Sequence, residues 1–275
     1  MDNDYDIIIE PGKGARQYWR DVWRFRELFY FLAWRDVLVR YKQTVIGVAW
    51  SIIRPFMTMV VFSVVFGNLA KLPSNGVPYP ILVYTAMLPW QFFASSLSES
   101  SNSLIANANM LSKVYFPRLV VPTSSVIVSL VDFFISGLIL VVLMVWYQFV
   151  PGWRIFAMPI FLLLALVASL GFGLLLSALN VKYRDFRYIV PFIVQFGLYI
   201  SPVGFSSTVV PEKWRLIYSL NPMVGVIDGF RWAILGGQIE FYWPGFILSS
   251  LLTLIVFSVG VSYFRKTERT FADVI

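Results

Sequence analysis

Few residues in this chain could carry chemistry, and two that stand out are charges inside apolar segments. Asp132 lies about eleven residues into one such segment, and Arg54 lies near the start of another. An unpaired carboxylate in the middle of a bilayer costs at least about 2.5 kcal/mol, so Asp132 needs a partner. We expect it to form an intramembrane charge pair with Arg54, where Pro55 locally frees backbone carbonyls. The alternatives are a protonated Asp132, or one bonded to Ser or Thr hydroxyls.

The residue types that are missing exclude most enzyme mechanisms. The chain has no His and no Cys. It therefore has no His general base, Cys nucleophile, His or Cys metal ligand, or disulfide. Asp-x-Asp patterns in residues 2–6 resemble those of metal-dependent glycosyltransferases, but an exposed acidic terminus accounts for them. We expect no catalytic residue, no metal site and no cofactor bound by this chain.

The composition is that of a membrane protein. Of the 275 residues, 58% are hydrophobic and 13% are charged, and the mean hydropathy is +0.72. Five runs contain no Asp, Glu, Lys or Arg, and each is long enough for a helix across about 30 Å of hydrocarbon. These runs are residues 72–98, 133–153, 155–181, 188–211 and 241–264.

A sixth apolar run follows Gly47 and carries Arg54 and Pro55 near its start. We count it as a helix with an irregularity, which makes the expected fold class all-α with six transmembrane helices. The organisation is then a cytoplasmic N-terminus at 1–46, a membrane domain at 47–264 and a cytoplasmic tail at 265–275. The expected spans are 47–70, 79–100, 121–148, 155–180, 188–206 and 243–264.

The distribution of basic residues predicts the orientation. Of the 22 Lys and Arg, seventeen lie in the termini, the start of the first span and the loops on one face, and five lie on the other face. Because basic loops stay in the cytoplasm, both termini are expected there, in a multi-pass protein of the inner (cytoplasmic) membrane. The same rule explains the net charge of +7 without nucleic acid as a partner. Because the first ten residues are acidic and lack a long apolar stretch, we expect no signal peptide.

Two non-spanning segments on the cytoplasmic side could meet partners. Residues 16–42 have an apolar face at three- and four-residue steps and a basic opposite face, typical of a helix lying in the membrane interface among anionic lipids; a soluble helix packed on a partner is the alternative. The loop after the second span is polar and too long for a simple turn. It could present a short helix to a soluble partner, or be a plain basic loop. Its candidate contacts are Asn109, Ser112, Lys113, Tyr115 and Arg118.

Residues 206–242 form the longest stretch on the other face. Two apolar pieces, 214–220 and 223–235, are too short to cross a bilayer. We expect outer re-entrant half-helices, with Asn221 and Pro222 starting the second one.

Two helical stripes combine aromatic and polar side chains. In the fifth span four such residues recur at steps of four, three and four, and the first span has a similar stripe that begins with Ser51 and Arg54. These stripes could line a pathway for a sugar substrate, or be buried packing seams. The candidate pathway residues are Thr58, Phe62, Phe66, Tyr188, Phe192, Gln195 and Tyr199.

A separate stripe of small residues lies in the fourth span, at Ala165, Ser169, Gly173 and Ser177. It permits close approach of another helix, for which we favour packing within the subunit over dimerisation.

Taken together, several segments resemble the membrane subunit of type-two ABC exporters for lipid-linked polysaccharides such as O-antigen, capsule or teichoic acid. The resemblance covers essentially the whole chain. It is carried by RDVLVRYKQTVIGVAWSIIRP at 35–55, LVD at 130–132, VKYRDFR at 181–187, SPVGF at 201–205 and NP(x6)GFRW at 221–232.

The resemblance implies a homodimer, a cytoplasmic coupling helix after the second span and a separate ATPase in two copies. No G-x-x-x-x-G-K-[ST] loop occurs in this chain, and Gly12-Lys13-Gly14 lacks the required spacing. ATP and Mg are therefore expected on the partner ATPase, and this chain is expected to be a transport subunit rather than an enzyme. The lipid-linked nature of the substrate comes from the resemblance alone.

Three alternatives remain. A drug or small-lipid exporter shares the architecture implied by the resemblance. An ion-coupled secondary transporter needs intramembrane ionisable groups, for which only Asp132 qualifies, with Arg54 and Glu99 nearer the cytoplasmic ends. A membrane-embedded glycosyl- or acyltransferase is disfavoured by the missing His and the absence of clustered carboxylates inside the spans.

Overall fold

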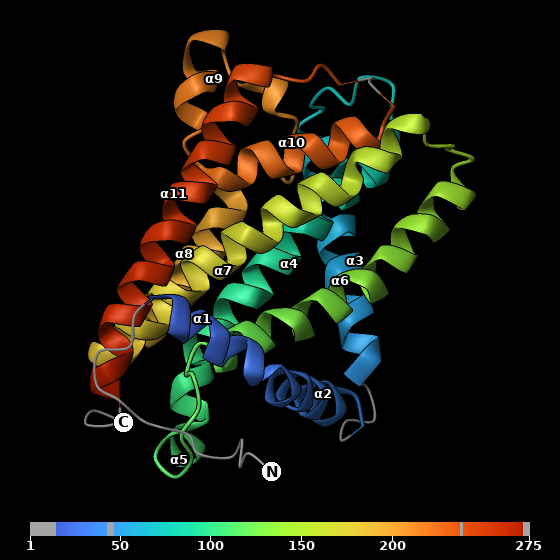
Figure 1. The fold of residues 1–275 in the computed structure, drawn as a ribbon. Coiled ribbons are helices and arrows are strands. Elements are labelled where there is room, and N and C mark those ends of the chain that lie inside the picture. Colours follow the sequence, from blue (N-terminus) through green and yellow to red (C-terminus); the bar gives the residue numbers. More distant parts are fainter. Residues whose placement is uncertain (1–14, 43–46, 237–238, 272–275) are drawn as a thin grey trace.

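The computed structural model describes residues 15–42, 47–236 and 239–271, and every regular element in these ranges is helical (Figure 1). The α-helices are α1 (Ala15–Arg24), α2 (Arg26–Lys42), α3 (Gly47–Phe62), α4 (Tyr79–Ala106), α5 (Ala108–Leu111), α6 (Val120–Trp146), α7 (Met158–Lys182), α8 (Phe186–Ile200), α9 (Glu212–Tyr218), α10 (Pro222–Ile234) and α11 (Trp243–Thr267). A π-helical segment, η1 (Ser63–Leu69), continues α3, and 3-10 turns lie at Trp153–Ala157, Ser207–Val209 and Glu268–Thr270.

The all-α membrane class is confirmed. In the described ranges, four helices are long and apolar enough to cross a membrane: Ala49–Leu69, Val120–Trp146, Trp153–Lys182 and Trp243–Thr270. The second and fifth expected spans correspond to α4 and α8, which do not meet that description. The six-span count therefore stays a prediction.

The fifth expected span ends earlier than predicted. We expected it to run to residue 206, but α8 ends at Ile200. Ser201 precedes Pro202, and a residue before proline disfavours the helical conformation. At about 1.5 Å per residue the 15 residues of α8 cover roughly 22 Å, less than the hydrocarbon thickness.

Helix α4 is the centre of the fold and packs against α3, α6, α7, α8 and α10. Its second half is rich in serine, and small side chains let neighbouring backbones come close. A Cβ on Gly173 of α7 would lie 2.6 Å from Ser100 Oγ, and Asn180 Nδ2 donates to Ser101 O at 2.9 Å. The small-residue stripe of α7 therefore packs inside the subunit, as we favoured.

Helices α7 and α11 cross at two glycines. A Cβ on Gly260 would lie 2.2 Å from Gly171 O, which no side chain tolerates. This contact lets α11 lie directly against α7 in Figure 1.

The expected half-helices are present as α9 and α10, at the top of Figure 1. Asn221 Oδ1 accepts a hydrogen bond from the Met223 amide at 3.0 Å, and Pro222 occupies the first helical position. This is the N-cap geometry predicted for the second half-helix.

Arg231 of α10 joins three parts of this end of the molecule. Its side chain is fully buried, and its guanidinium donates to Leu82 O at 3.3 Å, Val203 O at 3.0 Å and Phe205 O at 2.7 Å. Tyr79 Oη donates to the carbonyl between the last two, Gly204 O, at 2.7 Å. The non-helical segment after α8 thus has its carbonyls satisfied by side chains.

At the opposite end of Figure 1, α1 and α2 lie across the bundle. We expected one helix over 16–42, whereas the chain breaks at Phe25 into two. Its predicted apolar face points inward: Tyr18, Phe25 and Phe29 pack on a cluster that includes the buried Leu32. Trp19, Trp23 and Trp34 are exposed, as expected of interfacial residues.

Replacing Arg231 by Met is expected to cost about 2–4 kcal/mol of stability, because three buried carbonyls lose a charged donor. The measurement is the midpoint of thermal unfolding of the purified chain in detergent. Lys213→Met removes an exposed cation from the neighbouring α9 and should leave the midpoint unchanged. Equal midpoints for the two variants would contradict the role given to Arg231.

Candidate functional site

Asp132 of α6 is the centre of a cluster that joins four helices. Its Oδ2 accepts from Arg40 Nη1 of α2 at 2.8 Å, and its Oδ1 accepts from Ser51 Oγ of α3 at 3.3 Å and from the Tyr41 hydroxyl. Arg40 also pairs with Glu99 of α4, with Nη2 and Oε1 2.7 Å apart. Burial and the bond to Asp132 raise the pKa of the Tyr41 phenol, so it remains a donor.

The structure corrects the partner predicted for Asp132. The carboxylate has a cationic partner, as expected, but it is Arg40 rather than Arg54. Arg54 lies three residues beyond Ser51, and its side chain is exposed. Arg54 is the one basic residue within the expected spans, whereas α2 lies across α6 and brings Arg40 to the carboxylate.

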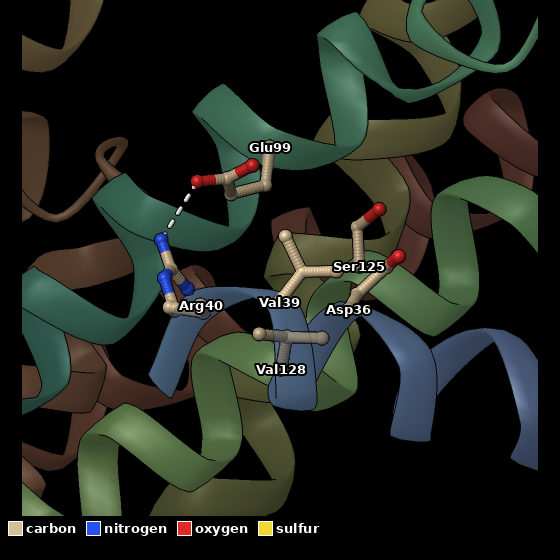
Figure 2. Close-up of a pocket in the computed structure, with 6 residues that line it drawn as sticks. All are labelled: Asp36, Val39, Arg40, Glu99, Ser125 and Val128. Atoms are coloured by element: carbon tan, nitrogen blue, oxygen red, sulfur yellow. Dashed lines mark hydrogen bonds and ion pairs between the residues drawn. The ribbon is translucent and has the colours of Figure 1, made fainter. Parts of the chain in front are cut away.

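A cavity of about 310 Å³ lies beside this cluster (Figure 2). Figure 2 shows Arg40 pointing up to Glu99, with the dashed contact between α2 and α4. The cavity carries charges of both signs and therefore presents no uniform field to an anion. Its lining residues are Asp36, Val39, Arg40, Glu99, Ser125 and Val128.

Four of the predicted pathway residues share an exposed face of α8. Tyr188 is 77%, Phe192 63% and Tyr199 59% exposed, and Gln195 between them is exposed as well. An amide and two phenols here have no hydrogen-bonding counterpart in lipid tails. This face is available to a second subunit or to a polar substrate.

The predicted pathway residues on α3 differ in how far they are buried. Phe62 is buried, at 7% exposure, and packs against Phe66 and Tyr199 with ring centroids 5.3 and 6.4 Å away. Both phenylalanines lie over Gly204. Thr58 donates to Arg54 O at 3.0 Å. Phe62 therefore belongs to a buried packing seam within the subunit, which was the alternative to a place in the pathway. Phe66 is half-buried.

The loop after α4 contains the short helix α5 and separates into an exposed and an anchored part. Asn109, Ser112, Lys113 and Tyr115 are exposed, as a docking surface requires. Arg118 is instead half-buried: it donates to Glu268 O and lies 6.0 Å from the ring of Phe271. Arg118 thus anchors the loop to the residues after α11, and its contact with a partner stays a prediction.

The same anchor includes α1. Tyr18 Oη donates to Glu268 Oε2 at 2.8 Å, and the Arg265 guanidinium lies 4.8 Å from the Tyr18 ring. Burial and the adjacent carboxylate raise the pKa of the Tyr18 phenol, which keeps it protonated. Arg35 of α2 also donates to Asn107 Oδ1 at 3.0 Å, just before α5. The loop, α1, α2 and the end of α11 thus form one connected unit.

Removing both charges of the Arg40–Asp132 pair is expected to lower the free energy of unfolding by less than the sum of the two single substitutions. A cycle of Arg40→Gln and Asp132→Asn should give a coupling energy of about 1 kcal/mol, since Arg40 is 31% exposed and solvent weakens the attraction. Thermal unfolding in detergent provides the measurement. The matched cycle of Arg54→Gln and Asp132→Asn should be additive. Coupling in the Arg54 cycle and additivity in the Arg40 cycle would contradict the pairing of Arg40 with Asp132.

Comparison with known proteins identifies the family. The profile of the ABC-2 type transporter family matches residues 27–235. The O-antigen export system permease protein RfbA of Klebsiella pneumoniae is 28% identical over 243 residues, which cover 88% of this chain and 92% of that protein. RfbA of Myxococcus xanthus is 27% identical over 258 residues, covering 93% and 98%. The polysialic acid transport protein KpsM of Escherichia coli is 21% identical over 241 residues, covering 85% and 91%.

The matched region begins in α2 and ends after α10, so it contains the Asp132 cluster, the α8 face and Arg231. The resemblance found in the sequence motifs is thereby confirmed. This chain belongs to the ABC-2 type transporter family.

Proposed function

We propose that this chain is the permease subunit of an ATP-driven exporter that moves lipid-linked polysaccharide across the cytoplasmic membrane. Relatives named for O-antigen export and polysialic acid transport align over nearly their whole length, which supports the substrate class. The geometric observation that carries the proposal is the exposed α8 face. Its phenols and amide can bond to glycan hydroxyls, and its rings offer stacking surfaces to pyranose faces.

The active assembly in this proposal is a homodimer. Helices α3 and α8 expose large apolar side chains next to the polar stripe, including Trp50, Met57 and Phe196. Two copies that bring these faces together would enclose the stripes of both subunits. The pathway would then lie between the subunits and not within one.

The energy source in this proposal is a separate ATPase, bound in two copies on the cytoplasmic side where both termini lie. ABC transporters couple transport to ATP hydrolysis, and family membership implies such a partner. The exposed part of the α5 loop is the docking surface that we assign to it. ATP and Mg bind to the ATPase and none to this chain.

Changing the polar groups of the α8 face is expected to reduce export. Gln195→Leu and Tyr199→Phe each remove hydrogen-bonding capacity at similar size, which should lower export of the native glycan about 2- to 10-fold. The measurement is surface glycan per assembled complex. Ser258→Ala is the matched control, because it removes an exposed hydroxyl from α11, outside the proposed pathway. Normal export by both α8 variants, or losses explained by failed assembly, would contradict this pathway.

The docking surface is tested by crosslinking in this cysteine-free chain. Cysteine replacing the exposed Ser112 should crosslink to the ATPase, and cysteine replacing Lys213 on α9 should not. Both positions are exposed, so accessibility is matched. Crosslinking at the α9 position alone would reverse the proposed orientation.

A further inference from the structure

Helix α11 has an exposed apolar face that runs into a basic one. After Trp243, its exposed large apolar residues are between 50% and 56% accessible and recur at helical steps: Ile247, Leu251, Leu254, Ile255 and Val259. Steps of three, four and three residues from Val259 continue the same face to Ser262, Lys266 and Arg269, which are all exposed. One helix face therefore changes from apolar at Val259 to cationic at Lys266 within about two turns.

The position of that change matches the thickness of a membrane. Trp243 at the start of α11 is exposed and suits the outer interface. Nineteen residues separate it from Ser262, which is about 29 Å of helix, close to the hydrocarbon thickness of about 30 Å. Ser262 thus lies where the acyl chains end, and the basic residues after it lie among the headgroups of the opposite leaflet.

A cavity lies at the basic end of this helix face. Ser262, Arg265, Lys266 and Arg269 line an open cavity of about 390 Å³. None of the ion pairs within 4.0 Å in the described part of the chain uses these three cations, although the Glu268 carboxylate, which accepts from Tyr18, interacts electrostatically with Arg265 and Arg269. A helix dipole favours cations at its C-terminus, but it does not require them around a shared cavity. Three cations and a hydroxyl around one hollow are a recognition surface for a phosphate group.

We propose that α11 binds an anionic phospholipid of this leaflet at that cavity. The phosphate contacts Ser262, Lys266 and Arg269, and an acyl chain lies along Val259 and Ile255. A soluble anion would use the basic residues alone, and the apolar face that leads directly into the cavity favours a lipid. Arg265 lines the cavity and also lies over the Tyr18 ring, so the bound lipid contacts the unit that holds α1 to the α5 loop.

The test uses a single fluorophore on a cysteine replacing Val259. The purified chain is placed in phosphatidylcholine vesicles that contain a small fraction of either brominated phosphatidylglycerol or brominated phosphatidylcholine, whose chains quench the fluorophore on contact. We expect the anionic lipid to show about 3- to 10-fold higher relative association at low salt, declining as salt is added. The vesicles contain no lipid-linked glycan and no ATPase, so the result is independent of the proposed function.

Three controls make the test specific. A fluorophore replacing Ile247, on the same face near the other end of α11, should be quenched equally by both lipids. The double variant Lys266→Gln with Arg269→Gln should abolish the preference at position 259. The charge-matched variant Lys113→Gln with Arg184→Gln changes exposed cations elsewhere on the predicted cytoplasmic side and should keep it. Equal quenching at 259, an equal preference at 247, or a preference that survives the first double variant would each overturn the proposal.

Discussion

The end of the molecule that contains α9 and α10 depends on the hydrogen bonds of Arg231. A chain inside or against a bilayer must satisfy its backbone polar groups internally, because lipid tails offer no partner. Where α8 stops at Ser201-Pro202, helical hydrogen bonding stops as well, and carbonyls of the next residues are left without helical donors. The Arg231 guanidinium bonds two of them and also Leu82 O of α4. The buried cation therefore supplies the hydrogen-bond donors that the break in the helix removes.

The same constraint acts at the other end with the charges reversed. There the group is the partly buried carboxylate of Asp132, and the donors come from side chains on α2 and α3. Arg40 also pairs with Glu99 of α4, so α2, which lies across the bundle, is held to two other helices by ion pairs. Each end of the bundle is thus stabilised by one ionic group, Arg231 or Asp132. Between these ends, serine and glycine let α4, α7 and α11 pack closely.

Sequence periodicity predicted the features that depend on neighbours along one helix. The Asn221-Pro222 cap, the two half-helices and the shared face of Tyr188, Phe192, Gln195 and Tyr199 follow from spacing within a helix. The partners of Asp132 and Arg231 could not be predicted in this way, because each is supplied by helices distant in the chain. Phe62 illustrates the same limit: its stripe was correct, but whether the stripe faces a pathway or Tyr199 and Gly204 depends on tertiary packing.

The arrangement of contacts indicates how motion at the α5 loop would reach the proposed pathway. Arg118, after the loop, is bound to the end of α11, which is bound to α1 through Tyr18 and Glu268. Asn107, before the loop, is bound to Arg35 of α2, and α2 is bound to α6 and α3 through Asp132. These contacts connect the residue before the loop to α3 through Arg35 and Arg40 of α2 and Asp132 of α6. Since Ser51 belongs to the same helix as the polar stripe of α3, this set of contacts joins the proposed docking surface to one of the two helices of the proposed pathway.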